Sequence, residues 1–472
     1  MKSKIFGTAM MVICVAFAGA QENRLTLQKS IELALAKNIP TKQSEVTMQR
    51  AEVNYKQAKN NRLPTIDGQF NYGINSGRSI DPFTNGYINQ NLTSSSANTQ
   101  AQLPVFSGMQ LKNVIKQNEY AFATATMEWQ QRKDELTLAV ILAYLQILNT
   151  EDALLLAHQQ ALITKQQVER LEIIAREGAA PPGNLSDLQG QYAGDQLAII
   201  AAENNVESSK LTLTQLMGIN YDSTLRIDRS GFDSTVRTYD AVPDQIYTTA
   251  LGQLASVKAS DLRVKSSAAG VKAAASGYYP SLSLYGVLNT NYSSAAMINT
   301  PVGSVDVPTG DYVVVNGANL PVIATRNKFE SEKITYGSQF NNNIATAYGL
   351  SLRIPIFSAF QTRSQVRIAK NEEKFNRLVA DNVKFQLRQA VDQAYVNLLT
   401  TEKRYNMLQT QVAAYAESFR IAEVRFENGV INAPEYLIAK NNLERTRATV
   451  ITTRYEYLLR TKVLDFYMGR LK

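Results

Sequence analysis

The sequence predicts a mixed α and β membrane protein that is mostly helical, and three observations support this class. One unit of helices and strands occurs twice along the 472 residues. Each copy carries two runs of residues that alternate between apolar and polar, as in strands with one apolar face. Each copy also has a proline-free stretch of about 70 residues with a sustained heptad pattern, which is typical of a long coiled-coil helix.

The first twenty residues predict a secretory signal peptide. Lys2 and Lys4 precede a mostly apolar run over 5–17, and small residues then lead up to a cleavage site after Ala20. Cys14 lies inside the apolar run rather than at the cut, so we expect no lipidation. Downstream no stretch approaches 18 consecutive apolar residues, so we expect no transmembrane helix and membrane entry only as β-structure.

Two constant offsets reveal the internal repeat. Residues 103–108 recur as 354–359, and this offset of 251 also carries Gly178 onto Gly429. Earlier landmarks match at an offset of 216, so the second copy holds 35 extra residues. They fall in a stretch of about 295–339 that is rich in Gly, Asn, Val and Thr, which we expect to be an extracellular loop.

The predicted organisation follows from this repeat. The chain divides into a signal peptide, a first repeat, a linker or equatorial segment, and a second repeat, at 1–20, 21–220, 221–243 and 244–472. A helix opens each repeat. The expected strands span about 65–76, 94–106, 281–292 and 342–356. Each second strand leads into a long helix and then a further helix, with bounds 107–177 and 185–217 in the first copy and 358–427 and 434–468 in the second.

Each predicted strand is ten residues long or slightly longer, which suits a tilted membrane-crossing strand. Alternation alone fits a half-buried soluble sheet equally well. The helices favour the membrane, because a helix of about 70 residues would be on the order of 105 Å long, and no compact soluble domain houses two such rods. Proline lacks the N–H that continues a strand ladder, so four prolines predict strand–helix junctions, at Pro64, Pro104, Pro280 and Pro355.

Four amphipathic strands cannot close a barrel, and lipid does not tolerate an open sheet edge. Several chains must therefore pool their strands, and three chains would supply the twelve strands of a plausible membrane barrel. The helices would then pool as well, into an α-barrel tunnel of antiparallel coiled coils that continues the β-barrel.

Composition excludes several classes of site. A single Cys excludes a disulfide framework and Cys-based zinc or iron–sulfur sites, and a single His argues against a hydrolase triad or multi-His metal centre. We therefore expect no enzyme activity, no catalytic residues, no metal and no cofactor. Signal-peptide cleavage would remove two lysines and lower the net charge from +8 to +6, a small excess that predicts no nucleic-acid partner.

With these features assembled, the chain resembles the TolC-type outer-membrane efflux proteins, the outer membrane factors of tripartite efflux and secretion systems. The resemblance covers essentially the whole mature chain. It is carried by the opening Leu25–Gln28, Ala34-Leu35 and Asn38, by the paired strand–proline–helix junctions and by the duplicated long helices. It implies a homotrimer in the outer membrane of a Gram-negative bacterium, with a twelve-stranded barrel in the lipid and a helical tunnel in the periplasm.

The resemblance also implies partners and a function. The partners would be a periplasmic adaptor (membrane fusion) protein and an inner-membrane transporter, either a proton-driven pump or an ATP-driven exporter. The protein would be the passive exit duct of a tripartite efflux pump. Two alternatives stay open: an exit duct for type I protein secretion, and, in another class, a non-conducting structural rod across the periplasm.

Two glycine turns are the first candidate sites. Glycine frees the backbone to turn between antiparallel helices, so a plain hairpin turn is one interpretation. The resemblance implies that these turns also form the periplasmic tip that docks the adaptor. The residues are Gly178, Ala179 and Ala180 in the first copy, and Gly429, Val430 and Ile431 in the second.

The resemblance further implies a periplasmic gate close to the tip. Its acidic ring falls on Glu435, and its first-copy counterpart is Asp187 if the first turn carries a three-residue insertion, or Asn184 if it does not. The gate aromatic falls on Phe426, whereas the family's gate arginine is replaced by Ile431. Both acids also fit the plain interpretation of helix N-terminal carboxylates that are stabilised by the helix dipole.

Overall fold

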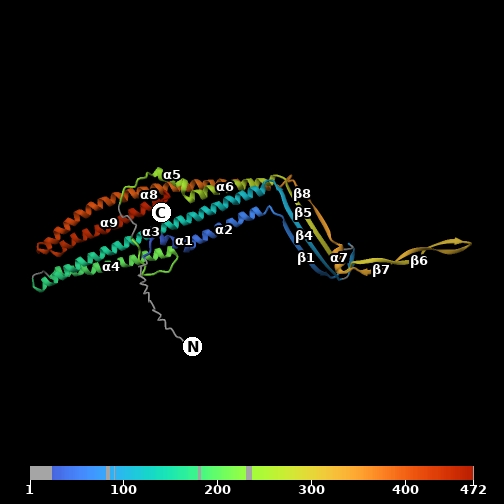
Figure 1. Ribbon diagram of the computed structural model, residues 1–472, viewed down its shortest axis with the longest axis horizontal. Helices are drawn as coiled ribbons and strands as arrows, with labels where there is room; N and C mark the ends of the chain where they lie inside the picture. The colour runs from blue at the N-terminus through green and yellow to red at the C-terminus, as the bar shows by residue number, and fades with distance from the viewer. Residues whose placement is uncertain (1–23, 81–84, 90, 179–181, 230–235, 471–472) are drawn as a thin grey trace, which may run out of the picture. The chain divides into compact units, whose positions relative to one another are not determined.

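The computed structural model describes residues 24–80, 85–89, 91–178, 182–229 and 236–470 (Figure 1). The expected signal peptide lies outside these residues. The described residues form two compact units. The first draws on the described parts of Met1–Glu52, Tyr120–Val264 and Phe375–Lys472, and the second on those of Val53–Glu119 and Lys265–Lys374. Each unit combines segments of both repeats, so the repeats are units of sequence rather than of packing.

The second unit contains an antiparallel sheet of four strands in the order β1-β4-β5-β8. Their bounds are Thr65–Asn75, Leu92–Ser107, Ser281–Ser293 and Ala345–Arg353. A small hairpin of β2 and β3 (Arg78–Ile80 and Tyr87–Asn89) lies between β1 and β4 in the chain. Each of the four strands predicted from alternation therefore has a counterpart in this sheet.

The register brings the alternation of all four strands into phase. Ile66 of β1 lies opposite Ala101, which lies opposite Gly286 of β5, which in turn lies opposite Tyr348 of β8. One face is therefore apolar and exposed on all four strands: Ile66, Phe70, Tyr72, Ile74, Phe106, Leu284, Leu288, Tyr348, Leu350 and Leu352. The other face is mainly polar, with Asp67, Gln69, Asn71, Ser96, Asn98, Gln100, Gln102, Ser283, Asn289, Asn291, Ser351 and Arg353.

Three of the four prolines lie at strand ends, and the fourth does not. Pro64 and Pro280 come directly before β1 and β5, and Pro355 follows β8. Pro104 instead lies inside β4, opposite Ser283, where the register shifts before Phe106. The strand–helix junction expected at Pro104 therefore lies beyond Ser107, because a bulge tolerates a residue without an N–H donor and the ladder resumes after it.

Left-handed residues make the turn from strand to long helix in both copies. In the first copy Gly108 and Met109 have φ of 59° and 67°, and in the second Ala359 and Phe360 have φ of 46° and 61°. The two copies thus share one junction geometry. Only the first copy has glycine, Gly108, at the first left-handed position, where glycine adopts a positive φ without steric cost.

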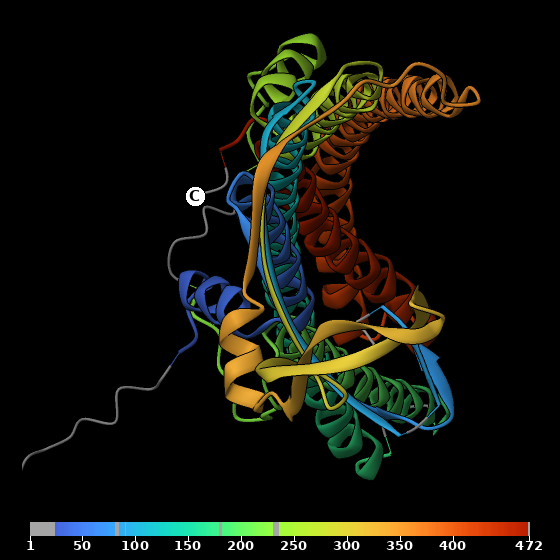
Figure 2. The ribbon, with the colours of Figure 1, turned by 90° about the vertical axis from the view of Figure 1, so that its right-hand side faces the viewer.

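The segment 295–339, expected as a loop, is instead largely a long β-hairpin. Strands β6 (Met297–Val315) and β7 (Ala318–Lys333) pair antiparallel around the two-residue turn Asn316-Gly317. Both turn residues have positive φ, 51° and 87°, as a type I′ hairpin turn requires. Helix α7 (Tyr336–Asn342) follows and leads into β8 (Figure 2).

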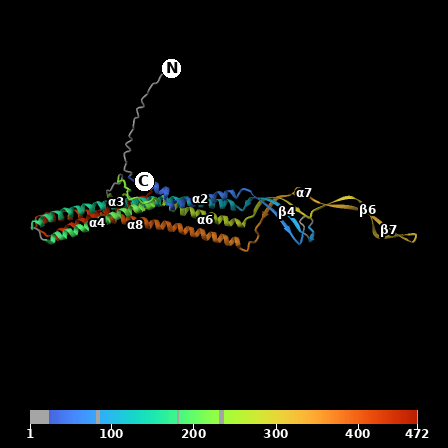
Figure 3. The ribbon, with the colours of Figure 1, turned by 90° about the horizontal axis from the view of Figure 1, so that it is seen from below.

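The first unit is built from helices. Figures 1 and 3 show α3 running beside α4 and α8 beside α9. The described helices have these bounds: α1 Leu27–Lys37, α2 Ile39–Asn60, α3 Gln110–Arg176, α4 Pro182–Met217, α5 Pro243–Gln253, α6 Ala255–Ala275, α8 Gln361–Glu427 and α9 Ala433–Tyr467. Helices α2, α3, α6 and α8 also continue into the second unit.

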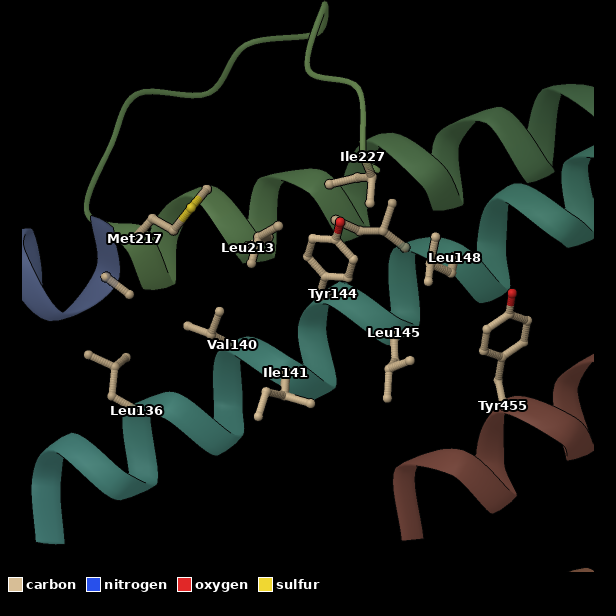
Figure 4. Close-up of a cluster of buried hydrophobic side chains, with 12 residues drawn as sticks. Leu136, Val140, Ile141, Tyr144, Leu145, Leu148, Leu213, Met217, Ile227 and Tyr455 are labelled. Carbon is tan, nitrogen blue, oxygen red and sulfur yellow. The ribbon is translucent and has the colours of Figure 1, made fainter. Parts of the chain in front are cut away.

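Helix α3 forms the centre of the first buried cluster (Figure 4). Leu136, Val140, Ile141, Tyr144, Leu145 and Leu148 of α3 meet Leu213 and Met217 of α4, Ile227 of the linker and Tyr455 of α9. A matching cluster surrounds α8, where Leu387, Val391 and Leu398 are buried against residues of α5, α6 and α9. Positions of the predicted heptad pattern are therefore buried in both copies: Leu136, Val140 and Ile147 on α3, and Leu387, Val391 and Leu398 on α8.

The linker, residues 221–243, contacts both helical hairpins of the first unit, which are the pairs α3–α4 and α8–α9. Ile227 is buried in the first cluster and forms a parallel bridge with Leu25. Farther along, the hydroxyl of Tyr457 donates to the carbonyl of Arg237, and that of Tyr239 donates to Asp465 Oδ1 at 3.1 Å.

Among the described helices, α3 is long and apolar enough to cross a membrane by length and composition alone, with a mean hydropathy of 1.4 over 18 residues. This differs from the expectation that no such helix is encoded. Length and composition alone do not make α3 a membrane span, because buried core helices satisfy the same criterion and 44% of that window is buried inside the chain.

Candidate functional site

The turn between α8 and α9 is closed by a Schellman motif. The N–H of Val430 donates to the carbonyl of Arg425 at 2.8 Å, and the N–H of Gly429 donates to that of Phe426 at 3.0 Å. Gly429 has a φ of 71°, which explains why glycine stands there. Asn432 then caps α9 by accepting from the N–H of Glu435 at 3.0 Å.

The turn between α3 and α4 begins in the same way. Gly178 also has a φ of 71°, and its N–H donates to the carbonyl of Ala175 at 3.0 Å. Ala179 and Ala180 lie outside the described residues. Helix α4 starts at Pro182, which is 251 residues before Ala433, the first residue of α9. The helix starts therefore follow the gapless alignment of the two copies.

An apolar cluster lies directly behind the two turns. Tyr436 of α9 is fully buried, and its ring stacks on Phe426 at 4.8 Å between centroids with a tilt of 21°. Val168, Leu171 and Leu188 are buried beside it. Ile431 packs against the same cluster, whereas Val430 stays 64% exposed. Val430 is thus the exposed apolar residue of the second turn.

Two polar contacts tie the hairpins to each other near the turns. Arg170 of α3 forms an ion pair with Glu427 of α8 at 2.7 Å and also donates to its carbonyl at 3.3 Å. Asn184 of α4 accepts from the N–H of Ala433 at 3.3 Å. Each contact joins the first repeat to the second, so the two turns are held as one surface.

A buried ionic cluster lies deeper between the hairpins. The ammonium of Lys440, with its side chain only 2% exposed, is 2.9 Å from Asp195 Oδ2 and 2.9 Å from Glu444 Oε1. Thr164 of α3 accepts from Lys440 and donates to Asp195. Burial raises the pKa of Glu444, although Lys440 opposes this rise. The cluster crosslinks α3, α4 and α9 where water is excluded.

A second ionic network holds the linker. Arg229 contacts Asp152 at 2.6 Å and Glu151 at 3.0 Å. Asp152 also accepts from Arg454 at 2.6 Å and from the Tyr455 hydroxyl at 2.8 Å. Burial and the Asp152 carboxylate raise the pKa of Tyr455 to about 12, so this tyrosine remains a hydrogen-bond donor at neutral pH.

Comparison with known proteins identifies this arrangement. Residues 30–219 and 246–470 match the family described as "Outer membrane efflux protein", one segment in each repeat. The chain belongs to the outer membrane efflux protein family. Membership confirms the resemblance, the duplicated fold, the location in the outer membrane and the function as an efflux exit duct. The family and its fold are those of channels.

Relatives agree over most of the chain. It is 19% identical over 476 residues to the outer membrane efflux protein BepC of Brucella suis, covering 99% of this chain and 90% of that relative. It is 20% identical over 360 residues to the outer membrane protein TolC of Vibrio cholerae, covering 74% and 70%. The crystal structure of the Campylobacter jejuni CmeC outer membrane channel has the same fold, with a TM-score of 0.74 and 16% identity over 94% and 87% of the two chains.

The predicted gate residues of this efflux protein fall into two groups. Glu435 and Asp187 are both exposed, and each directly precedes a fully buried residue, Tyr436 and Leu188. By this burial pattern Asp187 is the counterpart of Glu435, whereas by the helix starts it is Asn184. Phe426 differs from both acids, because its ring packs within its own chain.

The buried ionic cluster was not predicted from the sequence. Its signal is a charged residue in an otherwise apolar helix row: Lys440 lies seven residues after the buried Ala433 and is flanked by the buried Tyr436 and Leu443. The pattern marks Lys440 as exceptional, but the partners Asp195 and Thr164 come from distant segments and follow only from the packing. Among the described residues, no group of three or more His, Cys, Asp or Glu side chains is arranged to hold a metal ion.

Proposed function

We propose that three copies of this efflux channel close one twelve-stranded barrel around a shared pore, with four strands from each chain. The observation that carries the proposal is the in-phase sheet, whose outer strands β1 and β8 each pair on one side only within the described chain. Unpaired backbone groups in lipid cost several kcal/mol each. Joining β8 of one chain to β1 of the next removes both edges and leaves the apolar face toward lipid.

The polar face of the sheet would then line a water-filled pore. Its amide, hydroxyl and small side chains offer no deep pocket, which supports a duct that passes substrates without chemistry. No energy source is part of such a duct. We therefore propose a periplasmic adaptor and an inner-membrane transporter, either a proton-driven pump or an ATP-driven exporter, as the partners that load it.

The helix turns are the proposed docking surface for the adaptor. Gly178 and Gly429 share one backbone geometry, and Arg170–Glu427 and Asn184–Ala433 tie the surroundings of the two turns together. In a trimer this surface would occur three times, with Val430 exposed at each copy. Ala179 and Ala180, which lie outside the described residues, belong to the same proposal on the basis of sequence alone.

The proposed constriction lies one helical turn beyond. Glu435 and Asp187 would each face the pore three times in a trimer, and rings of carboxylates concentrate cations. Phe426, which is held against Tyr436, would form the wall behind them rather than a ring in the pore.

Conductance in a planar lipid bilayer tests the duct. We expect reproducible steps of conductance from the purified protein, which multivalent cations block from the periplasmic side. Glu435→Gln should weaken this block several-fold, whereas Glu169→Gln, at an exposed acid on α3, should leave it unchanged. An intact oligomer without conductance would contradict the duct and favour the structural rod.

A further inference from the structure

A cavity of about 320 Å³ lies inside the helical unit, where α5 ends and α6 begins. Leu254, the residue between these two helices, has an extended backbone with a ψ of 131°, so the chain bends there. The next residues, Ala255 and Ser256, are small, and so is Ala390, which lines the cavity from α8. Ligand pockets have volumes of roughly 300–1,000 Å³. The bend and its small side chains therefore leave room for a small organic molecule.

Most of the cavity lining is apolar. Phe466 and Tyr467 of α9 contribute two rings, whose centroids lie 5.5 Å apart with a tilt of 63°. Leu387 of α8 is buried, and Val383 and Leu254 are partly buried against the same cluster. Burial raises the pKa of Tyr467, so its hydroxyl stays neutral at physiological pH. Of the described residues that line the cavity, those outside α3 carry no charge.

The charged side of the cavity comes from α3. Asp134 and Glu135 both line it, and Glu135 is paired with Arg132 at 3.0 Å. Asp134 accepts a hydrogen bond of 2.7 Å from the side-chain amide of Gln130. Within the part of the chain that the structure describes, however, Asp134 forms no ion pair. The two neighbouring acids therefore differ, because only one of them has a counter-ion.

The Asp134 carboxylate is an uncompensated charge beside an apolar cavity. Desolvation raises its pKa, and the hydrogen bond from Gln130 and the charge of Lys133 offset this rise only in part. The Lys133 ammonium lies over the Trp129 ring, 3.9 Å from its centroid. A positively charged guest would supply the missing counter-ion, while its apolar part would displace water from the apolar lining.

We infer that this cavity binds lipophilic organic monocations, with Asp134 as their counter-ion. A neutral apolar guest would cover the carboxylate without pairing it, and an anion would meet two carboxylates. A metal ion fits less well, since the described residues contain no group of three or more His, Cys, Asp or Glu side chains that could hold one. The site lies within the helical unit of one chain, so the inference does not depend on the proposed trimer or its partners.

Ethidium, a fluorescent aromatic monocation, tests the inference with the purified oligomer. We expect saturable binding that raises its fluorescence. Asp134→Asn keeps the size of the side chain and the hydrogen bond from Gln130, and it should weaken binding about ten-fold or more. Glu169→Gln removes an exposed acid from the same helix and should change the dissociation constant by less than about two-fold. Absence of saturable binding, or equal affinity in the wild type and both variants, would overturn the inference.

Filling the cavity provides a second test that leaves Asp134 in place. Ala390→Phe should abolish ethidium binding in an oligomer of unchanged mass and helical spectrum, whereas Ala413→Phe, at an exposed alanine of α8, should bind as the wild type does. Normal binding by Ala390→Phe would place the ethidium elsewhere and overturn the inference. Conductance is measured separately, so the proposed duct would stand in that case.

The pH dependence of binding identifies the group that pairs with the cation. Only ionised Asp134 attracts ethidium, and its pKa is raised, so affinity should fall on acidification before the pH reaches the ordinary aspartate range. The other titratable lining residues are Glu135, which keeps Arg132 as its partner, and Tyr467, which is neutral throughout. The acidic loss should therefore be absent from the residual binding of Asp134→Asn. The same loss in that variant would overturn the role of Asp134.

Discussion

Lys440 shows how a single residue can join three helices. Its ammonium is buried with Asp195, Glu444 and Thr164, and it lies near the turns on which the proposed docking surface depends. A buried ion pair contributes little net stability compared with apolar side chains of the same volume, because desolvation offsets the attraction. Removing one partner is different, since it leaves an uncompensated charge in the core.

Lys440→Met should therefore destabilise the helical hairpins by about 3–5 kcal/mol. The cause is the Asp195 carboxylate, which stays buried without its counter-ion. Adding Asp195→Asn should recover part of the loss, and Lys165→Met, at an exposed lysine of α3, should change stability by less than about 0.5 kcal/mol. Urea unfolding of the detergent-solubilised protein, followed by helical circular dichroism, measures these differences. A loss from Lys440→Met no larger than that from Lys165→Met would show that the cluster is not structural.

The first strand–helix junction has less room for a side chain than its repeat in the second copy. A Cβ at Gly108 would lie 2.7 Å from Tyr279 Cβ and 2.8 Å from the Ser276 carbonyl oxygen. Gly108→Ala should cost about 1–3 kcal/mol through overpacking. The reverse change in the second copy, Ala359→Gly, should relieve a left-handed alanine worth roughly 1 kcal/mol. Thermal unfolding midpoints should move in opposite directions, and a shared direction would contradict the argument.

Val430 provides a direct test of the docking surface. Val430→Glu adds a charge to an exposed residue outside the packed cluster, so assembly and membrane insertion should be unchanged while export is lost. Gly429 is a poorer position for this test, because its φ of 71° would strain any side chain. Met407→Glu, at a similarly exposed residue on α8, is the matched control.

Accumulation of a fluorescent efflux substrate, in cells that depend on each variant, measures export. Normal export by Val430→Glu would remove Val430 from the docking surface, whereas loss of export by both variants would indicate a general fault of α8 rather than of the turn.

At the scale of elements, most of the fold follows from periodicity. The sheet strands and long helices were predictable because period two and period seven persist along them. The β6–β7 hairpin was missed because two bulges, near Val302 and over 309–311, break the alternation that identifies a strand. Its Asn316-Gly317 turn was the available signal. Pro104 was expected at the strand–helix junction because a proline at a bulge inside a strand cannot be told from one at a strand end by sequence alone.

At the scale of the molecule, sequence and packing divide the chain differently. The two repeats run one after the other, whereas each compact unit takes segments from both. The reason is that a strand pair or helix hairpin from one repeat has only half of the partners it needs. In the sheet, β4 of the first repeat pairs with β5 of the second, and in the helical unit Lys440 reaches back to Thr164. A repeat could be recognised from the sequence, but its partners come from the fold.

The edge strands of the sheet, β1 and β8, likewise need partners that one chain does not supply in the proposed barrel. The mass of the oligomer extracted from the outer-membrane fraction in mild detergent, measured by light scattering with the detergent contribution subtracted, tests it most directly. Three chain masses in one particle are the predicted result. A monomer or a dimer with a normal helical spectrum would contradict the shared barrel, since neither supplies the twelve strands on which the account depends.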